Sequence, residues 1–158
     1  MSEETQMEVR KPKYMDKFHL LNKAETELFN LIRQAAPSLY VFVQVSMSQI
    51  FWMSNRQKAF TQVREIGRKS IDYLLCREDM SIVVAIELNG PKHETEKQKV
   101  SDEKKRATLE EAGIPLLILK PDAMPDAKTL GAMIAPLVVE RKRYEKEKQE
   151  RIHKRTPL

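Results

Sequence analysis

Two acidic residues stand alone inside two neighbouring apolar stretches of this chain, and their spacing brings them face to face. Asp72 is the only charged residue in the predicted strand Ser70–Cys76, and Glu87 is the only one in the predicted strand Ser81–Leu88. A polar turn centred at 79–80 would join the strands as an antiparallel hairpin, in which residues equidistant from the centre pair. Asp72 then lies directly opposite Glu87, with Cβ atoms about 5 Å apart on one face of the sheet.

Two facing carboxylates repel each other and are costly to remove from water, so a pair on interior strands needs a compensating group. A shared proton, a basic neighbour or a bound divalent cation would each supply it. Mg²⁺ binds through one or two carboxylates and keeps several waters, and such an ion can activate a water against a phosphodiester. The pair therefore predicts a Mg²⁺ or Mn²⁺ site, or else a strand pair that a Lys or Arg neutralises.

The elements that must hold this pair follow from the periodicity of the apolar residues. Helical spacing begins after Asn22, which suits an N-cap, and β-branched and aromatic runs mark the strands. The expected order is helix 23–36, strand 40–45, short helices near 47–53 and 56–66, strands 70–76 and 81–88, helix 96–112, strand 114–119, and a long helix from 126 toward 151. This order predicts an α/β domain in which helices flank a central mixed sheet.

Three finer expectations concern these elements. The hairpin rule pairs Cys76 with Val83. The unbroken apolar run Ile114–Leu119 predicts a strand buried on both of its faces. Pro136 predicts a kink or a break in the last helix, because proline removes a helical hydrogen bond.

The composition fits one domain followed by a basic tail. The chain has 158 residues, 41% of them hydrophobic, and a formal net charge of +5. Residues 20–139 hold the apolar pattern, residues 1–19 are polar and expected to be flexible, and residues 140–158 carry eight Lys or Arg against four Glu. The tail is either a solvated helix with (i, i+4) ion pairs or an arm that adds salt-dependent affinity for nucleic acid.

The chain carries no sequence signal for a membrane or for secretion. No apolar run approaches the roughly 20 residues that span a bilayer, and the polar N-terminus lacks the apolar stretch of a signal peptide. Cys76 is the only cysteine, so no internal disulfide can form. We therefore expect a cytoplasmic protein with no membrane partner.

Several segments share a pattern with a known family. They are the opening Leu21–Glu25, the strand end Gln44-Val45, the segment Ile71–Cys76, the run Ala85–Asn89 followed by His93, and the stretch from Ser101-Asp102 to Ile118. Together they resemble the family catalogued as domain of unknown function 2726, over about residues 20–120. That family is placed among the PD-(D/E)XK, or restriction-endonuclease-like, nucleases, near the very-short-patch-repair endonucleases. The resemblance implies an αβββαβ core, which matches the order above, with the charged helix at the C-terminus added to it.

The resemblance also implies roles for particular residues. Asp72 stands for the first aspartate of the superfamily motif and Glu87 for its second acid. Glu25 stands where many members place an additional acid, and its plainer interpretation is an exposed helix residue. His93 matches a histidine of the family and could shuttle a proton or contact a phosphate, or make only a structural hydrogen bond.

One position departs from the motif. The superfamily lysine belongs two residues after the second acid, where this chain has Asn89 and where the family usually shows an aspartate. Asn89 can exchange hydrogen bonds but supplies no positive charge. Lys105, from the following helix, is the best candidate for a migrated lysine, and Lys92 is the second. The plainer interpretation of Lys105 is a surface lysine.

A group of basic residues precedes the strand that carries Asp72. Its members are Arg56, Lys58, Arg64, Arg68 and Lys69, with only Glu65 as an acid among them. Near the entrance to the acidic pair, they could position a phosphate backbone. The competing interpretation is an ordinary solvated helix face.

These observations favour a Mg²⁺- or Mn²⁺-dependent nuclease that acts on nucleic acid. DNA is the expected substrate, and the residues themselves leave RNA open. Lys105 or Lys92 would orient the attacking water or offset charge in the transition state. The alternative is a nuclease-like domain without catalysis that binds nucleic acid or a protein partner. A structural or assembly domain, with a homodimer among its forms, is the third hypothesis.

Overall fold

The computed structural model describes residue 14 and residues 17–51, 66–90 and 95–155. The elements in chain order are α1 (Lys23–Ala35), β1 (Tyr40–Ser46), α2 (Met47–Ile50), β2 (Ser70–Cys76), β3 (Ile82–Leu88), α4 (Glu96–Glu111), β4 (Leu116–Leu119), the 3-10 turn η1 (Pro121–Ala123) and α5 (Ala127–Arg155). The expected helix over 56–66 lies outside the described residues except for Ile66. The other expected elements are present, with ends that differ by a few residues.

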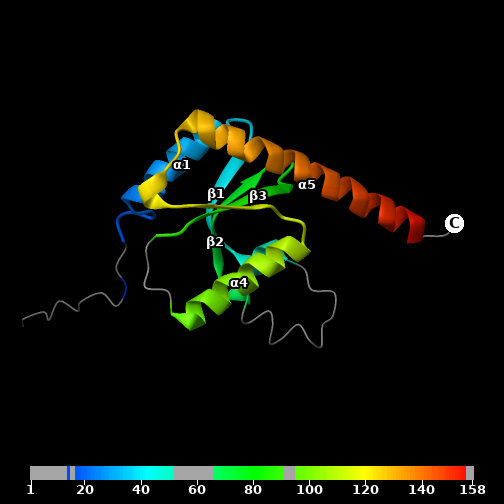
Figure 1. Cartoon of the computed structure of the whole chain (residues 1–158), viewed down its shortest axis with the longest axis horizontal. Helices are drawn as coiled ribbons and strands as arrows, with labels where there is room; N and C mark the ends of the chain where they lie inside the picture. The colour runs from blue at the N-terminus through cyan, green and yellow to red at the C-terminus, as the bar shows by residue number, and fades with distance from the viewer. Residues whose placement is uncertain (1–13, 15–16, 52–65, 91–94, 156–158) are drawn as a thin grey trace, which may run out of the picture.

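Four strands form one mixed sheet in the order β1-β2-β3-β4 (Figure 1). β1, β2 and β3 pair antiparallel, while β4 runs parallel to β3. A parallel pair needs a crossover connection, and α4 provides it. The expected α/β architecture, a mixed sheet flanked by helices, is therefore confirmed.

β4 lies at an edge of the sheet, and this corrects one expectation. Of its four residues only Leu119 is buried, while Leu116, Leu117 and Ile118 are half-buried. An edge strand has a neighbour on one side only, so its side chains are less enclosed. The prediction of a strand buried on both faces is confirmed only in part: Leu116 packs against one core and Leu117 against the other, but neither is fully buried. The partial burial follows from the strand order, which an apolar run does not encode.

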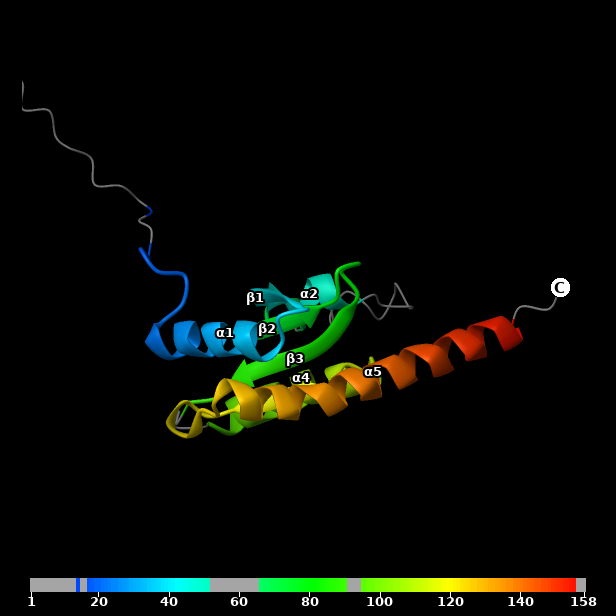
Figure 2. The same ribbon diagram turned by 90° about the horizontal axis from the view of Figure 1, so that it is seen from above.

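Helices cover both faces of the sheet. α1 and α5 lie on one face and α4 on the other (Figure 1), and α1 runs beside the first part of α5 when seen from above (Figure 2). One core joins Leu28 of α1 and Leu130 of α5 to Tyr73 of β2. The second core joins Leu109 of α4 to Leu74 of β2. From Tyr73 to Cys76, successive side chains of β2 thus enter opposite cores, as strand geometry requires. Ile71 breaks the alternation, because it lies in the core of Leu74 and not in that of Tyr73.

The β2–β3 hairpin has the expected register on the side of the acidic pair and a different one near its turn. Over Tyr73–Leu75 the pairing is as predicted, but Cys76 pairs with Ile82 instead of Val83. Val83 is therefore the extra residue of a β-bulge. Met80 in the turn has a φ of 64°, a conformation that apolar residues seldom adopt. The symmetric-loop rule is wrong at this end, because it assumes a turn without a bulge.

α5 is a single helix that continues through Pro136, so the proline does not end it. The helix also crosses the expected domain boundary at 139/140 without interruption, and its far half extends beyond the sheet (Figure 1). Across the described ranges, no helix, α5 included, combines the length and the apolar character needed to cross a membrane.

The beginning of the basic tail is bound to the fold. Arg141 donates from Nε to the carbonyl of Ile82 at 3.0 Å, and from Nη1 to the carbonyls of Ala112 at 3.0 Å and Gly113 at 2.8 Å. These bonds tie α5 to the hairpin and to the end of α4. The side chains of 146–154 are exposed. The choice between a solvated helix and a nucleic-acid arm therefore concerns this later part of the tail.

Candidate active site

Asp72 and Glu87 meet at the end of the β2–β3 ladder, where their side chains bind backbone groups of the opposite strand. The backbone N–H of Asp72 donates to Oε1 of Glu87 at 3.2 Å, and the backbone N–H of Leu88 donates to Oδ2 of Asp72 at 2.9 Å. The contacts of the described residues use these two oxygens. Asp72 Oδ1 and Glu87 Oε2 are therefore left for a further ligand.

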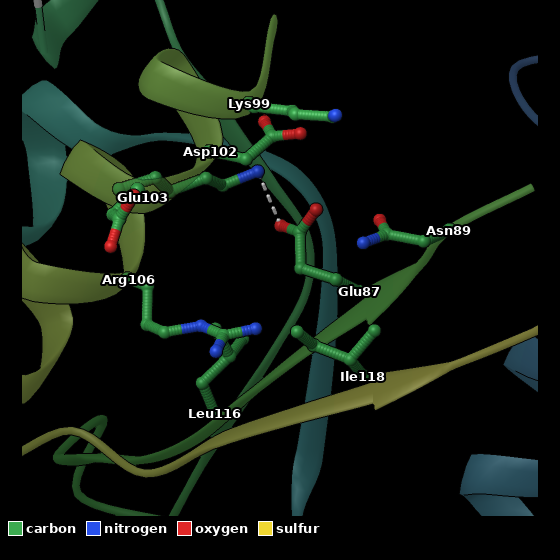
Figure 3. Close-up of a pocket in the computed structure, with 9 residues that line it drawn as sticks. Glu87, Asn89, Lys99, Asp102, Glu103, Arg106, Leu116 and Ile118 are labelled. Atoms are coloured by element: carbon green, nitrogen blue, oxygen red, sulfur yellow. Dashed lines mark ion pairs between the residues drawn. The ribbon is translucent and has the colours of Figure 1, made fainter. Parts of the chain in front are cut away.

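Lys105 is the third charged group of the site. Its Nζ lies 2.7 Å from Oε1 of Glu87, the contact dashed in Figure 3. The side chains of Lys105 and Glu87 are 13% and 11% exposed, so Lys105 is not an ordinary surface lysine. Leu109, one turn further along α4, is fully buried. Because residues i and i+4 share a helix face, the packing of Leu109 turns Lys105 toward the acids.

The positive charge of Lys105 does not fully compensate the two carboxylates of the site. Burial raises the pKa of Glu87 above its usual value, and the charge of Asp72 adds to this rise. The hydrogen bond and the positive charge of Lys105 lower the pKa without cancelling the effect of burial. Two buried or half-buried acids thus have one lysine between them, so a proton or a further cation would stabilise the site.

A second lysine holds α4 over the site. Nζ of Lys69 donates to the backbone carbonyl and to the hydroxyl of Ser101, about one turn before Lys105 on α4. Lys69 is half-buried and directly precedes β2. This contact links the strand that carries Asp72 to the helix that carries Lys105. The sequence left Lys69 either a phosphate-binding residue or part of a solvated helix face. It does not reveal this link, because nothing in the sequence pairs residues 32 positions apart.

A cavity of about 310 Å³ opens beside Glu87, between α4 and the strands β3 and β4 (Figure 3). Leu116 and Ile118 of β4 form an apolar wall. The opposite wall is charged and consists of the α4 residues Lys99, Asp102, Glu103, Lys105 and Arg106. The volume lies at the lower end of the range for ligand sites, and it suits a small polar group.

Asn89 lines the same cavity as Glu87 (Figure 3). Its side chain is exposed, and its backbone N–H donates to the carbonyl of Leu119 at 2.9 Å, which fixes the chain at the end of β3. The strand position expected to hold a lysine thus presents a neutral amide. The positive charge beside Glu87 comes instead from Lys105 on the neighbouring helix.

Glu25 caps α1. Its Oε2 accepts from the backbone N–H of Asn22 at 2.8 Å, while its own N–H donates to Oδ1 of Asn22 at 2.9 Å, which together form a capping box. Its carbonyl accepts from the hydroxyl of Tyr73 at 2.7 Å, which ties α1 to the strand that carries Asp72. The capping role is a structural one, and the expected role of Glu25 as an additional catalytic acid stays a prediction.

Several expected site residues lie outside the described part of the chain. They are Arg56, Lys58, Arg64, Lys92 and His93. Arg68 is exposed at the start of the segment that leads into β2. The phosphate-binding role of this basic group and the role of His93 stay predictions.

The acidic pair suits a hard divalent cation by its chemistry. Carboxylate oxygens are ligands that Mg²⁺ and Mn²⁺ prefer. Within the residues that the structure describes, no three His, Cys, Asp or Glu gather in a way that could hold a metal. An ion at this place would rest on Asp72 and Glu87 and would complete its shell with water, as Mg²⁺ commonly does.

Gln44 is a residue beside the pair to which sequence analysis gave no role. The register of β1 and β2 places it opposite Asp72, and Ser70 Oγ donates to its Oε1 at 3.3 Å. Its signals in the sequence are that it alone in 40–45 is neither apolar nor aromatic and that the strand end Gln44-Val45 fits the family pattern. Those signals do not reveal which residue it faces, because the facing strand lies 26 residues further along the chain.

Comparison with known proteins gives a family and one distant relative. The family described as "Protein of unknown function (DUF2726)" matches residues 17–137. An "Uncharacterized protein" of Haemophilus influenzae is 27% identical over 107 residues, which are 65% of this chain and 54% of that protein. The chain thus spans about half the length of this curated relative. No solved structure matches the chain.

Proposed function

The chain belongs to the DUF2726 family, and on that premise we propose that it is a metal-dependent nuclease that hydrolyses phosphodiester bonds in DNA. The proposal places it in the PD-(D/E)XK, restriction-endonuclease-like superfamily, near the very-short-patch-repair endonucleases. The observation that carries it is the shielded group of Asp72, Glu87 and Lys105, two acids joined across a hairpin with a lysine 2.7 Å from one of them. The element order α1-β1-α2-β2-β3-α4-β4 supports it, because apart from the short helix α2 it has the order αβββαβ of the core of that superfamily.

Asp72 and Glu87 would hold Mg²⁺ or Mn²⁺ through Oδ1 and Oε2, since Oδ2 and Oε1 already accept hydrogen bonds. Such an ion supplies activation of a water and stabilisation of charge on the phosphate when it is bound. The contribution of the chain is to fix both acids in advance. The backbone N–H groups of Asp72 and Leu88 do this from the rigid ladder of the hairpin, which reduces the reorganisation needed for a reaction.

Lys105 provides the positive charge that Asn89 cannot provide. Its charge offsets part of the repulsion between the acids, and its ammonium can donate to a phosphate oxygen or to the attacking water once a substrate is present. Lys99 and Arg106 on the same wall of the cavity add charge that favours a phosphate. Asn89 can hold a water or a sugar oxygen by hydrogen bonds.

A second function, nucleic-acid or protein binding without catalysis, is favoured by one specific observation. Lys105 already pairs with Glu87, the most buried charge of the site, without a metal, and Asn89 leaves the third motif position neutral. A binding module would associate with DNA in a salt-dependent way, with no cleavage in any metal. Changing basic residues of 146–154 would then weaken binding more than changing Asp72.

Cleavage assays with matched variants test the proposal. The full chain is incubated with supercoiled plasmid and with single- and double-stranded oligonucleotides in Mg²⁺ or Mn²⁺. We expect cleavage that Asp72→Asn and Glu87→Gln abolish, because each removes one carboxylate while its shape is kept. Asp122→Asn and Glu110→Gln are the controls, since both acids are exposed and neither lines the cavity. They should cleave as the wild type does.

Three results would contradict the nuclease proposal. Cleavage that survives both changes at the pair would show that another site, or a contaminant, is responsible. A wild type that binds DNA at low salt without cutting it would favour the binding module. A wild type that neither binds nor cuts would favour the structural or assembly domain.

A further inference from the structure

The strand residue that faces Asp72 from β1 has an unusual backbone. Gln44 has a φ of 51°, in the left-handed region, where a side chain crowds its own backbone. Two other non-glycine residues in the described part of the chain have a positive φ, Phe18 and Met80. Phe18 lies in the segment before α1 and Met80 in the hairpin turn. Gln44 is the one that lies inside a strand.

No shift of register between β1 and β2 accounts for the left-handed conformation of Gln44. Val43 pairs with Tyr73 and Val45 with Ile71, so the pairing has the same offset before and after Gln44. The conformation does accompany a change in packing, because Val43 belongs to one core and Val45 to the other. A strand that needs a left-handed residue for packing alone is best served by glycine, which adopts that φ without crowding.

A glutamine at this position therefore indicates a use for its carboxamide. Ser70 Oγ donates to Gln44 Oε1 at 3.3 Å, and the register of β1 and β2 places Gln44 opposite Asp72. The carboxamide is thus held by its oxygen at the strand position that faces Asp72, and the contacts of the described residues leave its NH₂ group as a donor. The face of β1 that carries Tyr40 and Phe42 is open to solvent, since these residues are 49% and 41% exposed.

We infer that Gln44 is a substrate-binding residue whose Nε2 donates to a non-bridging phosphate oxygen of the nucleic-acid strand held at Asp72 and Glu87. The inference deepens the proposed nuclease function and rests on it. A neutral hydrogen-bond donor suits the position of Gln44. Lys105 contacts Glu87 from α4, and a phosphate bound beside the two carboxylates would also need a donor on the side away from Lys105. The backbone strain at Gln44 is then the cost of aiming the amide at the substrate.

Two substitutions separate the amide from the strain. Gln44→Gly removes both, so we expect Tm to rise by about 2–4 °C while kcat/KM for cleavage falls about 10-fold, mainly through KM. Gln44→Met keeps the length and the strain but has no donor, so we expect an unchanged Tm with a similar loss of kcat/KM. Phe42→Gly is the matched control for stability, because Phe42 lies on the same strand with an ordinary φ. It should lower Tm.

The measurements are thermal unfolding and initial cleavage rates over a range of oligonucleotide concentrations in Mn²⁺. A Gln44→Gly variant that is more stable and as active as the wild type would overturn the inference, because the strain would then serve packing alone. A Gln44→Gly variant that loses as much stability as Phe42→Gly would show that the backbone at Gln44 is not strained, and would also overturn the inference. A wild type that cleaves while all Gln44 variants cleave equally well refutes only the role of Gln44. A wild type that neither cleaves nor binds overturns the proposed function and this inference together.

Discussion

Replacing Lys105 by methionine measures how strongly the charges of the site are coupled. Methionine keeps an unbranched apolar side chain and removes the ammonium group. Glu87, which is 8% exposed, would then keep only the backbone N–H of Asp72 as a donor. Removal of one partner from a buried ion pair costs about 3–5 kcal/mol, because the other charge stays buried without compensation.

Two features of the structure reduce this cost. The side chains alone of Lys105 and Glu87 are 13% and 11% exposed, so water still screens part of their charge. Glu87 can also take up a proton, since burial already raises its pKa, and a neutral carboxyl no longer needs the lysine. We therefore expect Lys105→Met to lose about 2–3 kcal/mol of unfolding free energy at pH 8. That loss lowers Tm by about 4–12 °C for a chain of this size.

The loss depends on pH with a definite sign. A carboxyl whose pKa is higher in the folded state binds more protons there, so stability falls as pH rises from the unfolded value of 4.5 through the folded pKa. Without Lys105 the folded pKa of Glu87 is higher still, so the fall continues to a higher pH than in the wild type. The deficit of Lys105→Met is therefore small near pH 5 and largest at pH 8.

Urea unfolding followed by circular dichroism at pH 5, 6.5 and 8 measures this difference. Lys142→Met, at an exposed position of α5, controls for the loss of a lysine charge from a helix. The double variant Lys105→Met/Glu87→Gln should recover much of the loss at pH 8, because it removes the uncompensated carboxylate as well. A deficit that is equal at pH 5 and pH 8, or no larger than that of Lys142→Met, would refute the coupling.

Three further predictions concern the metal, the tail and the cap. Mn²⁺ at a free concentration of about 100 times its Kd should stabilise the wild type by about 2.7 kcal/mol and leave Asp72→Asn unchanged in scanning calorimetry; equal shifts in both proteins would contradict binding at the pair. Arg141→Ala should cost about 2–3 kcal/mol in urea unfolding, because three backbone carbonyls lose a charged donor, whereas the exposed Lys142→Ala should stay within about 0.5 kcal/mol. Asn22→Ala should lower the free energy of unfolding by about 1 kcal/mol through loss of the helix cap, whereas Glu25→Gln keeps the capping box and should leave stability unchanged. A fall in cleavage by Glu25→Gln would support the role of Glu25 as an additional acid. Unchanged cleavage would show that Glu25 only caps the helix.

The parts of the site that sequence predicts are those set by local periodicity. Asp72 and Glu87 are single charges in two short apolar runs, and a hairpin between such runs fixes which residues meet. The register over Tyr73–Leu75 is the predicted one. The loop between Cys76 and Ile82 is centred on Asp79 rather than between Asp79 and Met80, and the extra residue of the bulge, Val83, compensates for this difference. The pairs beyond the bulge therefore have the predicted partners.

The parts that sequence does not predict depend on contacts between distant segments or on backbone conformation. The edge position of β4 follows from the order of strands, which an apolar run does not record. The bond from Lys69 to Ser101 joins segments 32 residues apart. The positive φ of Gln44 has no counterpart in composition or spacing. Lys105 is an intermediate case, because the resemblance named it while the helix pattern alone allowed a surface lysine.

The docking of α4 unites these observations. α4 is a strongly polar helix that contributes few apolar side chains, among them the buried Leu109, so it depends on polar contacts to hold its place. Two of those contacts lie at the site: Lys69 binds its second turn, and Glu87 binds Lys105. In the proposed enzyme the positive charge beside the acids is therefore the ammonium group of Lys105 on α4. The contact of Lys105 with Glu87 also helps to hold α4 in place. Under the proposed superfamily assignment, a charge supplied from α4 would leave the strand position of the superfamily lysine free for a neutral hydrogen-bonding side chain, here Asn89.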